Sequence, residues 1–213
     1  MSSATRVIGA QVKDESRIQE RRAQIAEAAA RVFRDKGFHT ATIRDVAEAA
    51  GLTQGTLYNY IRSKDDILYL VHQDLTARYI ADVEQAIAGI ADPRARLRAA
   101  LRAFARAMRE RHADIALIYQ ETHALGRESR RAVLAQTEDF IARFAGLIEA
   151  ARRDGMAMDG APNLAADIVT FLPVMLSLRR WRLRHVDGPA AEEELVAFLL
   201  RGLGCPEEII HGA

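Results

Sequence analysis

One stretch, from Thr42 to Arg62, constrains the fold of this chain more than any other: TIRDVAEAAGLTQGTLYNYIR. Thr42 followed by Asp45 is the signature of a helix start, with a hydroxyl cap and a carboxylate three residues later. Apolar residues then recur at helical spacing as far as Gly51, which tolerates the positive φ at which many helices end. Thr53 is a second candidate cap, and the residues after it form another apolar stripe. The stretch therefore predicts two short helices joined by a tight turn, which is a helix-turn-helix.

The second short helix leaves a polar face without acidic residues, formed by Gln54, Gly55, Thr56, Tyr58 and Asn59. Such a face suits a groove lined by phosphates, and the second helix of a helix-turn-helix enters the major groove of DNA with its N-terminus first. Gln54 and Asn59 are suited to reading base edges. The residues better suited to holding the DNA backbone are Thr42, Thr53, Tyr58 and Tyr60. A helical hairpin inside an all-α core, without any role in DNA binding, is the alternative that this spacing leaves open.

The flanking residues add a resemblance to a known family. The order T-L-Y-N-Y-I-R-S-K-D-D-I-L, after an upstream helix that ends R-V-F-R-D-K-G-F, resembles the TetR family of bacterial transcriptional regulators. The resemblance implies that Thr42 and Arg44 meet phosphates or the groove edge, and that Lys64 closes on the phosphate backbone. The residues that it places on the recognition helix are Thr53, Gln54, Thr56, Tyr58, Asn59 and Tyr60. Ile61 stands where the family often has Phe, and it is still apolar enough to fill the core.

The family resemblance favours two domains in a chain of 213 residues. We expect a flexible arm over 1–14, a helix-turn-helix DNA-binding domain over 15–66, a helical ligand-binding and dimerisation domain over 67–205, and a tail over 206–213. In the arm, Arg6 and Lys13 could touch DNA, although solvated disorder is the expected state. A long helix after Ser63, running to about Ile90, is the predicted lever between the two domains.

Beyond Pro93 the periodicity of the chain is helical throughout, so the predicted fold class is all-α. The helices are expected at 93–111, 113–126, 129–153, 163–185 and 189–203. Pro173 should kink the fourth of them. The last two are apolar on more than one face, which is more than a surface helix needs, and the family resemblance implies that they pair with their mates in a homodimer.

Net charge and cysteine content indicate how this protein could bind DNA and in which cellular compartment we expect it. The formal net charge is only +1, so affinity for DNA must come from the local placement of cations. The stripe Arg94, Arg98, Arg102 and Arg106 is expected to be a solvated helix face, with a site for a phosphorylated ligand as the alternative. A lone cysteine, Cys205, and the lack of a secretion signal or an apolar run of membrane length predict a cytoplasmic protein.

Polar residues interrupt an otherwise apolar helix between Asp114 and Leu125, and at least one of them should point inward and need a partner there. The candidate ligand-binding residues are Phe104, Met108, Tyr119, Glu121, Thr122, His123, Phe144, Met175 and Trp181. Glu121 and His123 lack a second pair of ligands at metal spacing, so no metal site is predicted. No cofactor is predicted either.

The sequence lacks a Gly-rich phosphate loop, Cys-x-x-Cys, His-Glu-x-x-His and Gly-x-Ser-x-Gly, which argues against an enzyme. We therefore expect a homodimeric repressor that binds a pseudo-palindromic operator in double-stranded DNA and is released by a small-molecule effector. The effector would be hydrophobic or an acyl-CoA thioester, because Ile-Leu-Tyr-Leu-Val after Lys64 and a later Gln-Glu-Thr segment are similar to the acyl-CoA-sensing branch. A helical adaptor without specific DNA binding is the alternative.

Overall fold

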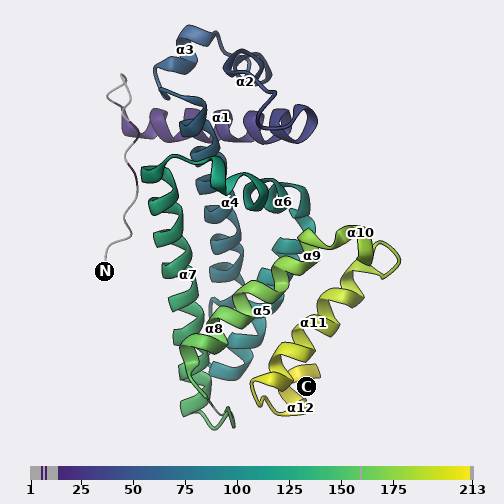
Figure 1. Cartoon of the computed structure of the whole chain (residues 1–213). Coiled ribbons are helices and arrows are strands. Elements are labelled where there is room, and N and C mark those ends of the chain that lie inside the picture. The colour runs from purple at the N-terminus through teal and green to yellow at the C-terminus, as the bar shows by residue number, and fades with distance from the viewer. Residues whose placement is uncertain (1–5, 7, 9–13, 159, 212–213) are drawn as a thin grey trace. The chain divides into compact units, whose positions relative to one another are not determined.

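The computed structural model describes residues 6, 8, 14–158 and 160–211 (Figure 1). Within these residues the regular elements are all helical, as predicted. The chain divides into two compact units. The first unit contains residues 1–77 and 116–136, and the second contains 78–115 and 137–213. None of the helices in the described part combines the length and the apolar character that crossing a bilayer requires.

Three helices lie entirely in the first unit: α1 (Glu15–Lys36), α2 (Ile43–Ala49) and α3 (Gln54–Tyr58). It also holds the first part of α4 (Lys64–Ile87), most of α6 (His112–Glu121), the 3-10 turn η1 (Thr122–Ala124) and the start of α7 (Arg127–Arg153). The segment 116–136, which the predicted domains assign to the second domain, thus groups with the first unit. The predicted domains were defined by function, as a DNA-binding and a ligand-binding domain. A division into compact units does not test function, so the predicted domain boundary stays a prediction.

The second unit contains the remaining parts of α4, α6 and α7 and seven further elements. These are α5 (Pro93–Glu110), α8 (Pro162–Phe171), η2 (Leu172–Val174), α9 (Met175–Leu178), α10 (Arg180–Leu183), α11 (Gly188–Gly202) and α12 (Glu207–His211). The single helix expected over 163–185 is divided into shorter ones, because a 3-10 turn interrupts it at Pro173, where a kink was predicted, and a second break lies at Arg179. The expected tail instead contains α12, whose Ile210 is buried.

The core of each unit follows the predicted apolar faces. In α1 the expected inward residues, among them Ile25 and Phe33, are buried, and the Phe38 ring packs edge-on against Phe33 with centroids 5.2 Å apart. In the second unit Phe104, Phe140 and Phe144 form an aromatic cluster with centroids 5.0–5.9 Å apart. These clusters hold the helices at fixed spacing, because aromatic pairs combine large buried areas with preferred geometry.

Two residues of the expected mobile arm are fastened to the first unit. The Arg6 guanidinium donates to Asp66 Oδ1 at 2.6 Å and to Asp65 Oδ2 at 3.1 Å. Ile8 is buried, and its carbonyl accepts a hydrogen bond from Arg22. At these positions the expectation of a solvated arm is wrong, because Arg6 pairs with the buried carboxylate of Asp66 and with the partly exposed Asp65. Lys13 and most of the arm lie outside the described residues.

The arginine stripe of α5 is not the fully solvated face that was expected. Arg94 pairs with Asp154 at 3.0 Å, Arg102 pairs with Glu193, and Arg106 approaches Glu192 at 3.6 Å. Glu192 and Glu193 belong to α11, so much of the stripe ties two helices of the second unit together. The sequence could not show this, since acidic partners some 90 positions away carry no local signal.

A buried histidine in α4 should make stability depend on pH. Burial lowers the pKa of the His72 imidazole to about 4, from an ordinary value of about 6.5. As the pH falls from 6.5 to 4 the unfolded chain binds a proton that the folded chain excludes, so the folded state should lose about 3 kcal/mol. Urea unfolding at neutral pH and at about pH 4 measures this loss. In His72→Gln the loss of unfolding free energy between neutral pH and pH 4 should be smaller by this amount. If the loss is as large as in the wild type, another group causes it.

Candidate nucleic-acid interface

The helices α2 and α3 and the turn between them form what we call the reading head. Its first helix begins with the predicted capping box. Thr42 Oγ1 accepts from the Asp45 amide at 3.1 Å, and Asp45 Oδ2 accepts from the Thr42 amide at 2.8 Å. The Lys36 ammonium also donates to Asp45 at 2.7 Å. The hydrogen bond from Lys36, followed by those from Thr42, holds the pKa of the Asp45 carboxyl well below its usual range. These reciprocal bonds fix where α2 starts and so present Thr42 and Arg44, both exposed, at its N-terminal end.

The corner between α2 and α3 depends on a glycine and a hydrophobic plug. Gly51 has φ of 66°, a left-handed conformation that side chains with a Cβ rarely adopt. The Leu52 amide reaches back to the Ala47 carbonyl at 2.9 Å and closes the end of α2. Leu57 is the buried residue of α3, with none of its surface exposed. The predicted helix-turn-helix is therefore present, and local residues account for it (Figure 1).

The second helix of the pair presents its N-terminal end and a polar face. Thr53 Oγ1 accepts from the Thr56 amide at 3.0 Å, and the two hydroxyls lie 2.8 Å apart. Gln54 and Tyr58 are exposed and Asn59 is half-buried. The first turn of α3 has no acidic residue that would repel a phosphate at the N-terminal end of the helix.

Two predicted contacts differ from this pattern. Tyr60 is only 6% exposed, so it packs into the small core and has little surface left for DNA. Lys64 stands at the first position of α4, as expected, but its ammonium donates to the His39 carbonyl at 3.0 Å and lies over the Phe38 ring, 4.6 Å from the centroid. Partial burial lowers the pKa of Lys64. An ammonium has three donors, so Lys64 keeps N–H groups for a phosphate beside the one that bonds to His39.

His39 is an exposed residue of this region that the sequence analysis did not single out. It lies between α1 and α2, and its imidazole approaches Glu121 to 3.3 Å. No local pattern could have identified it, because the two residues are far apart in the chain and meet only in the folded first unit.

The nine candidate ligand-binding residues are divided between the two units. Tyr119, Glu121, Thr122 and His123 belong to the first unit, and Phe104, Met108, Phe144, Met175 and Trp181 belong to the second. In the first group the Thr122 hydroxyl bonds to the Ile118 carbonyl of its own helix, and Tyr119 and His123 are exposed. In the second group Phe104, Met108 and Phe144 are buried core residues, whereas Trp181 is mostly exposed. Glu121 is the inward polar group that the pattern predicted, because its Oε2 is shielded from water and accepts no hydrogen bond.

The second unit has a cavity of about 220 Å³ between its helices. Its apolar lining comes from α4 and α7, and Phe144 is the one candidate residue that belongs to it. Arg96 and Arg143 also line the cavity, and Arg143 donates to Glu84 at 2.6 Å. An apolar hollow with guanidinium groups at its edge can accept a chain that ends in an anionic head.

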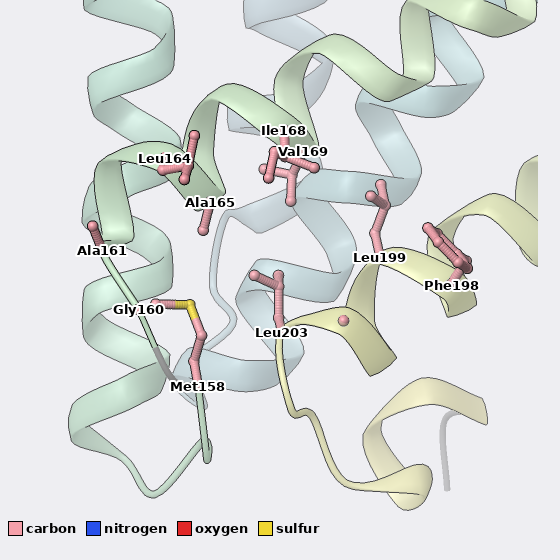
Figure 2. Close-up of a pocket in the computed structure, with 11 residues that line it drawn as sticks. Met158, Gly160, Ala161, Leu164, Ala165, Ile168, Val169, Phe198, Leu199 and Leu203 are labelled. Atoms are coloured by element: carbon pink, nitrogen blue, oxygen red, sulfur yellow. The ribbon is translucent and has the colours of Figure 1, made fainter.

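A second hollow, of about 250 Å³, lies between α8 and α11 (Figure 2). Leu164 and Ile168 of α8 and Phe198 of α11 line it, and all three are substantially exposed. Phe171 at the end of α8 is also exposed. Such a concentration of large apolar side chains on two helices marks an interaction surface, because isolated exposed leucines are common but contiguous patches are not.

The sequence and the fold of this chain are similar to those of known bacterial regulators. The family described as bacterial regulatory proteins, tetR family, matches residues 25–69, and the tetracyclin repressor-like C-terminal domain matches residues 91–201. The HTH-type transcriptional regulator HbdR of Aromatoleum is 33% identical over 65% of this chain and 59% of its own length. The HTH-type transcriptional activator FasR of Mycolicibacterium smegmatis is 31% identical over 86% of this chain and 83% of its own length. The crystal structure of AibR in complex with isovaleryl coenzyme A and operator DNA has a similar fold, with a TM-score of 0.70, 20% identity, and coverage of 87% of this chain and 99% of that one.

Proposed function

This chain belongs to the TetR family of bacterial regulatory proteins and is a DNA-binding regulator of transcription rather than an enzyme, and from that premise we propose that it acts as a homodimeric, effector-controlled repressor. The observation that carries the proposal is the capped reading head, whose α3 exposes polar side chains and no acidic residue. An adaptor role would leave this surface without a purpose. FasR is named a transcriptional activator, so membership of the family does not by itself imply repression.

In the proposed complex, two reading heads occupy successive major grooves on one face of a pseudo-palindrome, about 34 Å apart. Gln54 and Asn59 would read base edges, while Thr42, Arg44, Thr53, Thr56, Tyr58 and Lys64 would position the heads on phosphates. Tyr60 keeps a structural role in this scheme, because its side chain is buried. Selection from a random duplex library should therefore enrich an inverted repeat, whereas no enrichment at low salt would contradict sequence-specific binding.

Single substitutions should separate positioning contacts from reading contacts. Lys64→Ala should weaken binding to all sequences and lower the salt slope of log K by about one unit, because one phosphate contact is lost. Gln54→Ala should instead relax the preference at particular base pairs by about 1–3 kcal/mol, with the salt slope unchanged. Titrations of the selected duplex and of single-base variants across a salt series measure both effects. The proposed roles fail if the two variants behave alike while unfolding as the wild type does.

We assign the dimer interface to α8 and α11. Leu164 is 63% exposed and Phe198 is 66% exposed, and both lie on the face that includes the hollow of Figure 2. A second copy that covered this face would remove these side chains from water, at about 25 cal/mol for each Å² buried. An isologous pairing of this kind uses the same helices from both copies, as a two-fold axis requires.

The effector is proposed to enter the cavity of the second unit. Its volume of about 220 Å³ is below the usual range of about 300–1,000 Å³ for small-molecule sites, so it suits an acyl chain better than a whole coenzyme. Arg96 and Arg143 beside it would meet the phosphates of a coenzyme A head. The bound ligand of AibR supports this class of effector, since that protein has the same fold.

Operator titration with and without acyl-CoA thioesters of several chain lengths tests the effector. A true effector should lower operator affinity to the extent that it prefers the non-binding state. It should also stabilise the protein, by about 2.7 kcal/mol at 100 times its Kd. Free coenzyme A is the matched control for the head group. If no chain length near millimolar concentration changes the thermal stability, acyl-CoA is not the effector.

A further inference from the structure

Two histidines and one glutamate from distant parts of the sequence meet in the first unit. His39 lies in the turn between α1 and α2, Glu121 ends α6, and His123 lies in η1. One potential ligand atom from each side chain lies within 4.8 Å of the other two. We propose that these three residues bind a divalent transition-metal ion of the zinc type. The site is independent of the effector cavity and of the proposed repressor function.

The spacing of the three groups fits the coordination sphere of such an ion. Histidine nitrogens and carboxylate oxygens bind Zn²⁺ at about 2.0–2.2 Å, which places neighbouring ligand atoms about 3.3 Å apart around a tetrahedral ion. His39 Nε2 and Glu121 Oε2 already lie 3.3 Å apart. His39 and His123 are both exposed, so small rotations of their side chains can complete the arrangement. Three protein ligands leave the fourth position to water.

A second observation points to a missing partner at this place. Glu121 Oε2 is shielded from water and accepts no hydrogen bond, although the His39 imidazole is close. The approach of that ring is therefore not aligned as a hydrogen bond. A shielded carboxylate oxygen without a partner is costly, and an ion is one of the few groups that would satisfy it.

The local charge indicates which class of ion would bind. Lys64 donates to the His39 carbonyl, and its charge interacts with that of Glu121, so this ammonium offsets the single carboxylate of the cluster. Ca²⁺ and Mg²⁺ depend on several oxygen ligands and accumulated negative charge, which the cluster lacks. Imidazole nitrogens instead suit Zn²⁺, Ni²⁺ and Cu²⁺. A bound ion would fasten the turn before α2 to the end of α6.

The test is a calorimetric titration of the full chain, carrying no histidine tag and freed of metal with a chelator, against Zn²⁺ and against Mg²⁺. We expect one Zn²⁺ per chain and no comparable binding of Mg²⁺. His123→Ala and Glu121→Gln should each lower the Zn²⁺ affinity by at least about 10-fold, since even loss of a second-shell partner costs 10–100-fold. Co²⁺ provides a second readout, because its visible absorption changes when a ligand is lost.

His185→Ala is the matched control, because His185 is another exposed histidine and lies outside the cluster. This variant should bind Zn²⁺ as the wild type does. Metal-free thermal unfolding of the three variants should match that of the wild type, which separates loss of a ligand from loss of the fold. The proposal is overturned if the wild type does not bind Zn²⁺, if the two cluster variants bind it with unchanged affinity, or if His185→Ala loses affinity to the same degree.

Discussion

Phe198→Asp should convert the proposed dimer to monomers and lower operator affinity by at least about 100-fold, because linking two reading heads multiplies affinity by 10²–10⁴. Phe198 is 66% exposed in the single chain, so the substitution should leave the fold of the chain intact. In a dimer through α8 and α11 the new carboxylate would be buried without a partner, and an unpaired buried charge is strongly unfavourable. Sedimentation analysis gives the oligomeric state, and titration of the selected operator gives the affinity.

Leu134→Asp is the matched control for this prediction. Leu134 is 54% exposed and belongs to the first unit, whereas the residues of the proposed interface belong to the second. The same chemical change there should leave both the oligomeric state and the operator affinity as in the wild type. A Phe198→Asp protein that remains dimeric and binds its operator normally would show that the interface lies elsewhere.

Asp66→Ala should destabilise the first unit by about 3–5 kcal/mol, the usual cost of removing one partner from a buried ion pair. Asp66 is 1% exposed and pairs with the Arg6 guanidinium at 2.6 Å. It also accepts from the amides of Arg62 at 2.7 Å and Ser63 at 3.1 Å, which caps α4. The substitution would remove the acceptor of both amides and of Arg6 Nη2, although Arg6 Nη1 keeps its hydrogen bond to Asp65. Denaturant unfolding followed by circular dichroism measures the change in the free energy of unfolding.

An exposed ion pair provides the comparison. Glu27 and Arg31 pair at 2.9 Å across one turn of α1, with both side chains largely in water. Glu27→Ala should therefore cost no more than about 0.5 kcal/mol. Equal losses in Asp66→Ala and Glu27→Ala would mean that burial of the Arg6–Asp66 pair does not add to stability in the way proposed.

The reading head could be predicted from the sequence because its determinants are local. Thr42 and Asp45 satisfy each other's backbone groups within one turn, and Gly51 is needed where the chain takes a left-handed conformation. Leu57 belongs to the apolar stripe expected after Thr53 and is fully buried. Interactions over three to five residues depend little on the rest of the fold, so the residue pattern alone was sufficient.

The remaining features depend on contacts between distant residues, which only the tertiary structure decided. Tyr60 and Tyr58 are near neighbours of the same chemical type, but packing buried one and exposed the other. Arg6 found its carboxylate partners 59 and 60 positions away. His39 met Glu121 because folding brought α6 to the turn before α2 within the first unit. Helical periodicity identifies the apolar face of a helix. It carries no information about the distant side chains that will contact this face or the polar residues beside it.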